Sequence, residues 1–85
     1  MNMNQSTTIN HPVAVTAMGF GRDMRAYPRR MEYQGATYDF IDAGLRLVVK
    51  SGEKIAEILT LSDGANQFRL KSDNHGGSWT LLSIS

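Results

Sequence analysis

Turn-forming residues recur about every ten residues from Pro28 onward, and this spacing constrains the fold more than any other feature of the sequence. The segments between the turns are short and rich in β-branched or aromatic residues, which is typical of strands. Strands joined by tight turns pair antiparallel. The sequence therefore predicts an all-β domain, a small antiparallel meander of six or seven strands forming a closed barrel or a strongly curled sheet.

The clearest single turn is Gln34-Gly35, which separates two segments with alternating apolar side chains. Glycine takes positive φ at low cost, as the tightest hairpins require. Residues 30–33 and 36–41 are therefore predicted to form the two arms of a hairpin. A second strong turn signal is the Ser-Asp-Gly-Ala run at residues 62–65.

The other expected strands are residues 13–18, 45–50, 68–71 and 78–84. They are joined by an expected loop at residues 19–28, a bend at 42–44 and a turn at 72–77. Residues 54–61 fit either a strand or a short helix capped by Ser51. The hairpin signals on both sides of this segment favour the strand.

The chain has 85 residues, enough for one domain with a small core. Residues 1–11 are polar and have little to bury, so we expect a disordered tail before a single domain at residues 12–85. The first residues lack a signal-peptide pattern, and no apolar run approaches the roughly 20 residues that span a bilayer. Cysteine is absent, which excludes disulfides and thiolate sites and favours a cytoplasmic location.

Sequence patterns for catalysis and metal binding are weak. Residues 19–21 (Gly-Phe-Gly) lack the third glycine and the following helix of a phosphate-binding loop. His75 lies within a Gly-rich turn, where a histidine is usually solvated, and its neighbour Asp73 is explained by turn formation. We therefore predict that the protein is not an enzyme, and we expect neither a metal nor a cofactor.

The strongest charge feature is the segment 22–30, which has four arginines and one acid, a net charge of +3. The rest of the chain has a net charge of −2. Guanidinium groups pair with phosphates, and an interleaved aromatic ring can stack on a base. In the simpler interpretation the arginines form ion pairs with nearby acids and cover apolar surface with their stems. Arg69 and Lys71 would extend the basic patch if they point outward.

The aromatic residues divide into two groups. Phe40, Phe68 and Trp79 lie in alternating strand segments and are expected in the core. Tyr27 and Phe20 lie in the basic loop, where burial is harder. We therefore expect these two side chains to be exposed and available for contacts.

The sequence is consistent with two functions, and in both the chain is a small non-enzymatic binding module. The first is weak binding of nucleic acid, with the arginines on phosphates and a tyrosine on a base. The alternative is a protein-interaction or self-assembling module, which would expose an apolar patch or strand edge, with an acidic protein surface as the partner. The candidate binding residues for either partner are Arg22, Arg25, Tyr27, Arg29 and Arg30.

The segment from Pro28 to Tyr38 also has a recognisable pattern, in which Pro28, Arg29, Tyr33, Gly35 and Tyr38 occupy the defining positions. It resembles the opening of small uncharacterised bacterial all-β domains, one family of which occurs near genes for translesion-polymerase accessory proteins. Those domains usually carry tryptophan at the position of Tyr33. The resemblance implies a bacterial, cytoplasmic protein in a DNA-linked genomic neighbourhood.

Overall fold

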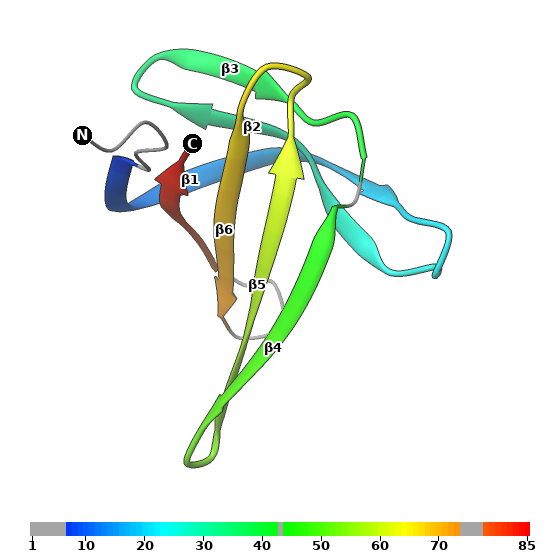
Figure 1. Ribbon diagram of the computed structural model, residues 1–85, viewed down its shortest axis with the longest axis vertical. Helices are drawn as coiled ribbons and strands as arrows, with labels where there is room; N and C mark the ends of the chain where they lie inside the picture. The colour runs from blue at the N-terminus through cyan, green and yellow to red at the C-terminus, as the bar shows by residue number, and fades with distance from the viewer. Residues whose placement is uncertain (1–6, 43, 74–77) are drawn as a thin grey trace, which may run out of the picture.

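The computed structural model describes residues 7–42, 44–73 and 78–85, which form seven strands and no helix (Figure 1). The strands are β1 (Thr7–Phe20), β2 (Ala26–Tyr33), β3 (Ala36–Asp39), β4 (Leu45–Ser51), β5 (Lys54–Ser62), β6 (Gln67–Asp73) and β7 (Ser78–Ile84). The all-β prediction is confirmed, and the ambiguous segment at residues 54–61 is a strand. Most of the expected turn at 72–77, with His75, lies outside the described residues.

All seven strands belong to one antiparallel sheet in the order β3-β2-β1-β7-β6-β5-β4. Strands that are consecutive in the chain are neighbours except for β3 and β4, and β1 pairs with β7. This is the strand order of an up-and-down barrel that is open between β3 and β4. The sheet curls (Figure 1) but does not close, so the closed barrel is not confirmed.

The first strand begins earlier than the sequence predicts. Thr7 pairs with Ile84 and His11 with Leu81, so residues 7–11 belong to β1. The prediction of a tail extending to residue 11 is therefore wrong for these five residues, and residues 1–6 lie outside the described ranges. The polar composition was misleading because backbone hydrogen bonds to β7, together with packing of Ile9 against the core, hold this segment.

Two hairpin turns have the backbone angles that their residues favour. Gln34 and Gly35 both have positive φ, 52° and 76°, as a type I′ turn requires. In the two-residue turn between β4 and β5, Gly52 has φ 62° and occupies the first central position, which fits a type II′ turn. Both turns twist in the direction that the flanking strands prefer.

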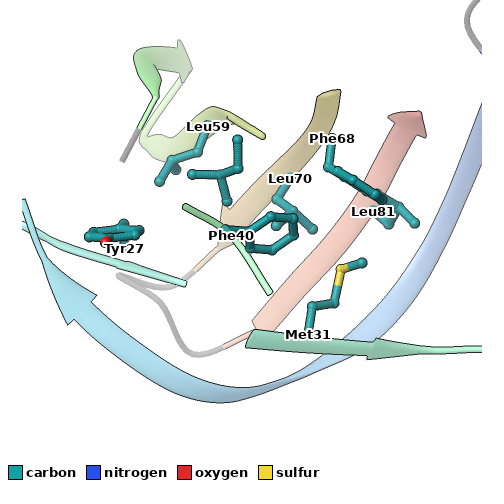
Figure 2. Close-up of a cluster of buried hydrophobic side chains, with 8 residues drawn as sticks. Tyr27, Met31, Phe40, Leu59, Phe68, Leu70 and Leu81 are labelled. Atoms are coloured by element: carbon teal, nitrogen blue, oxygen red, sulfur yellow. The ribbon is translucent and has the colours of Figure 1, made fainter. Parts of the chain in front are cut away.

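The core lies on the concave side of the curled sheet (Figure 2). Its buried apolar residues are Tyr27, Met31, Phe40, Leu59, Leu61, Phe68, Leu70 and Leu81. The Phe40 and Phe68 rings meet edge to face with their centroids 5.2 Å apart. The core positions expected for these two phenylalanines are confirmed, and Trp79 packs half-buried against the cluster. Strand β4 contributes no residue to this core.

The connection from β3 to β4 ties the two ends of the sheet together at one point. The Phe40 N–H donates to the Arg29 carbonyl of β2 at 2.8 Å, and the Ile41 N–H donates to the Ser62 carbonyl of β5 at 2.9 Å. Apart from this connection, β4 and the first half of β2 are not paired with each other, and an opening lies between them. The opening between β4 (Leu45–Ser51) and residues 26–29 of β2 is hereafter the seam.

Candidate interaction surface

The structure spreads the four candidate arginines over a hairpin tip and a strand. Arg22 and Arg25 lie in the five-residue connection between β1 and β2, while Arg29 and Arg30 lie on β2 itself. All four residues are exposed. The three ion pairs among the described residues leave out Arg22, Arg25 and Arg29. These three arginines are therefore available to an anionic partner.

Arg30 differs from the other three arginines because it already has an acidic neighbour. Its Nε lies 2.7 Å from Oδ1 of Asp39 on β3, directly across the β2–β3 pair. Both side chains are more than half exposed, so the pair is screened by solvent and adds little to stability. Its main effect is to reduce the net positive charge that Arg30 presents.

Tyr27 is buried, which corrects the expectation that it is an exposed contact residue. Only 6% of it is accessible, and it belongs to the core with Met31 of the same strand. The expectation failed because β2 begins at Ala26, so Tyr27 sits in a strand with its side chain on the core face. Phe20, in contrast, is 74% exposed at the end of β1, as expected.

The basic residues of β6 do not extend this patch. Phe68, Leu70 and Ser72 of β6 are buried on the core face, so Arg69 and Lys71 point to the opposite face. Arg25 of the β1–β2 hairpin, in contrast, lines a hollow together with Ser72 of the core face. Arg69 and Lys71 therefore lie on a different face of the sheet from Arg25.

The largest group of exposed apolar residues lies on the β4–β5 hairpin, which reaches beyond the rest of the sheet (Figure 1). In the described chain β6 pairs with β5 from Glu57 onward, so residues 54–56 pair with β4 alone. The hairpin's exposed large apolar residues are Leu45, Leu47, Val48, Val49 and Ile55. Residues 45–56 are hereafter the arm.

The arm has exposed apolar side chains on both of its faces. Arg46, Val48 and Ile55 lie on the same face as the buried Leu59, because these positions are paired or two residues apart in the β4–β5 register. Leu45, Leu47 and Val49 alternate with them and lie on the outer face, where Leu45 is 76% exposed. A strand with apolar side chains on both faces is normally covered on both, yet the described chain leaves these side chains of the arm exposed on both faces.

Arg46 connects the arm to the other side of the seam. Its Nη1 donates to Glu57 Oε1 at 2.9 Å, and its Nη2 donates to the Ala26 carbonyl at 2.8 Å. The pair is largely shielded, with 16% of the Arg46 side chain and 33% of the Glu57 side chain accessible. One guanidinium therefore bridges β5 and the start of β2.

Two adjoining hollows extend along the seam from this bridge. One, of about 270 Å³, is lined by residues that include Arg25, Arg46 and Trp79. The other, of about 360 Å³, lies between Arg25 and the arm residues Val48 and Ile55. The seam thus combines an apolar wall on the arm with a basic group from the β1–β2 hairpin.

Sequence reasoning did not identify Arg46, Glu57 or the arm as part of a site. One signal was present: residues 47–49 (Leu-Val-Val) interrupt the alternation expected of a strand with one solvent face. Such a run predicts apolar groups on both faces. The position of this strand at an edge, however, depends on the topology.

Comparisons with models of protein families, with curated proteins and with solved structures give no match. The resemblance of residues 28–38 to bacterial all-β domains therefore stays a prediction. In the part of the chain that the structure describes, no helix is long and apolar enough to cross a membrane. Within the same residues, no three His, Asp or Glu side chains gather closely enough to hold a metal ion.

Proposed function

We propose that this chain is a non-enzymatic protein-binding module and that the arm and the seam beside it form its binding surface. The observation that carries the proposal is the grouping of exposed large apolar side chains on the arm, with the exposed Met18 of the β1–β2 hairpin lining a hollow beside Arg46. Isolated exposed apolar residues are common on proteins, but a continuous group of them marks an interaction site. The hairpin contributes Met18, Phe20 and Met24.

The charges around this surface favour an acidic partner. Four exposed basic residues, Arg22 and Arg25 on the hairpin and Lys50 and Lys54 on the arm, outnumber the two exposed acids of these segments, Asp23 and Glu53. In an interface, a basic rim around an apolar centre gives specificity for a surface with acidic groups. The lack of cysteine agrees with a reducing compartment, so a cytoplasmic location, in a bacterium, remains part of the proposal.

The proposal is tested by affinity capture with the whole chain and two variants. A specific partner should be retained by the wild type after nuclease treatment and lost by Leu47→Asp, which places a charge on the outer face of the arm. Thr37→Asp, an exposed position on β3 at the other end of the strand order, makes the same change in charge outside the arm and should retain the same partner. Equal retention by all three proteins would show that the arm is not the binding surface.

Nucleic acid is a second candidate, favoured by the exposure of Arg22, Arg25 and Arg29 together with Phe20. In this case Phe20, and not Tyr27, would be the residue that stacks on a base. Amide NMR titration with single-stranded DNA, duplex DNA and RNA separates the two functions. Shifts at residues 20–30 that fade as salt rises would support nucleic acid, whereas no shifts at low salt would remove it.

A further inference from the structure

The edge of β4 along the seam carries backbone groups that face away from β5. The two-residue turn makes Ser51 and Lys54 a hydrogen-bonded pair, so Val49 and Leu47 also direct their backbone groups to β5. The alternate residues Val48 and Lys50 then direct their N–H and C=O groups into the seam. In the described chain, β4 has β5 as its one strand neighbour.

We propose that an extended segment of the partner, with alternating acidic and apolar side chains, adds as a strand to this edge of β4. This inference rests on the proposed function and specifies how the arm recognises its partner. Added strands gain affinity from main-chain hydrogen bonds and specificity from the side chains on either face. The bridge from Arg46 to the Ala26 carbonyl limits the free edge to the stretch beginning at Val48.

The chemistry of the segment follows from the two faces of β4. A residue opposite Lys50 would lie on the core-side face, toward the hollow lined by Arg25 and Glu57. The Glu57 carboxylate is already paired with Arg46, so an acidic side chain suits the position beside Lys50. Residues opposite Leu47 and Val49 would lie on the outer face, where apolar side chains would cover them. The alternation of acidic and apolar positions therefore matches the alternation along β4.

A second copy of this chain fits the same edge less well. The only charged residues of β4 are Arg46, which Glu57 already pairs, and Lys50, so pairing of two β4 strands brings like charges together and adds no new acid. Lysine on an edge strand is a common device against self-pairing. The basic hairpin residues Arg22 and Arg25 would add to this repulsion.

The probe is the synthetic peptide acetyl-Ser-Glu-Val-Thr-Val-Glu-Ser-amide, whose side-chain order is the same in both directions. At millimolar peptide, hydrogen exchange of the full chain should slow at least tenfold at the Val48 and Lys50 amides. The Leu70 amide, in the centre of the sheet, should be unchanged. The same peptide with lysine in place of glutamate should give no such protection.

Two variants separate strand addition from simple contact with the arm. Val48→Pro removes the edge N–H at a position where an edge strand tolerates proline, and it should lose peptide binding. Val48→Thr keeps that N–H and should bind. Lys50→Glu should reverse the charge preference for the peptide. In this variant the lysine peptide should slow exchange at the amides of residues 48 and 50, and the glutamate peptide should not.

Unchanged exchange at Val48 and Lys50, or equal binding by Val48→Pro, would overturn strand addition. If protection at these amides rises with protein concentration when no peptide is present, the added strand comes from a second copy of the chain. That result would also overturn the proposal of a partner segment. A protein partner that is captured by the wild type and lost by Leu47→Asp, while the peptide fails to bind, would leave the proposed function standing. Failure of both experiments would remove both proposals.

Discussion

Strands β4 and β6 have similar sequence patterns and opposite surroundings. Phe68 and Leu70 of β6 alternate with basic residues and are fully buried. Leu45 and Leu47 of β4 also alternate with a basic residue, yet they are 76% and 55% exposed. Phe68 and Leu70 lie on the core face of β6, whereas Leu45 and Leu47 lie on the outer face of β4, the last strand of the sheet. Alternation therefore shows which residues share a face, while the pairing register decides which of the two faces is turned toward the core.

The largest expected effect comes from the matched substitutions Leu70→Ala and Leu47→Ala. Removing the buried Leu70 side chain leaves a cavity, which typically costs about 2–5 kcal/mol of unfolding free energy. Leu47 is already more than half exposed, so its loss should cost less than about 1 kcal/mol. Chemical denaturation measures both values. Similar losses for the two variants would mean that the arm packs as tightly as β6.

Gly44, the residue just before the arm, is expected to be more sensitive to substitution than Gly52 at the tip of the arm. Gly44 has φ 61°, and a Cβ at this position would lie 1.6 Å from the Thr60 carbonyl oxygen. Gly44→Ala should therefore cost more than about 1 kcal/mol in thermal or chemical unfolding. Gly52→Ala at the tip also has positive φ but meets no neighbouring atom within 4 Å, so it should cost clearly less. An equal cost would refute the close contact at Gly44.

A smaller effect is expected at the bridge across the seam. Arg46→Ala removes hydrogen bonds to Glu57 and to the Ala26 carbonyl and should cost about 1 kcal/mol. The exposed pair of Arg30 and Asp39 is the comparison, and Arg30→Ala should cost only a few tenths of a kcal/mol. Denaturation curves of the two variants would contradict this ranking if Arg30→Ala cost as much as Arg46→Ala.

The smallest expected effect is a pH dependence in the β5–β6 turn. Backbone N–H groups of Asn66, and then Ala65, donate to the Asp63 carboxylate and lower its pKa below the ordinary 3.8. The stabilisation is present above the unfolded-state pKa and is lost as pH falls through the lower folded-state pKa. Asp63→Asn should therefore have a slightly lower melting temperature at neutral pH and match the wild type in strong acid. A constant difference at all pH values would contradict this linkage.

Local chemistry made the hairpins and part of the core predictable. Gln34-Gly35 and the 62–65 turn fix strand boundaries through backbone preference, and Phe40 and Phe68 alternate with polar neighbours. The unpredicted features depend on long-range pairing. Residues 7–11 pair with β7, a strand about seventy residues away in sequence. The same long-range pairing sets the strand order, in which β3 and β4 are not paired and the arm lies at an edge.

The candidate site was predictable only in part for the same reason. The exposure of Arg22, Arg25 and Phe20 follows from their position at a hairpin tip. The burial of Tyr27 depends on where β2 begins, and a shift of the strand boundary by two residues changes its surroundings. The bridge from Arg46 to Ala26 joins residues from opposite ends of the sheet, which no local pattern reports.

Hydrogen exchange of the free protein tests most directly whether β4 presents an open edge. The account predicts that the Val48 and Lys50 amides exchange almost as fast as those of an unstructured peptide, while Leu47 and Val49, bonded to β5, exchange more slowly. Leu59 and Leu70 should exchange slowest of all. Protection of Val48 and Lys50 equal to that of Leu70, at every protein concentration, would show that the seam is closed and would contradict the account.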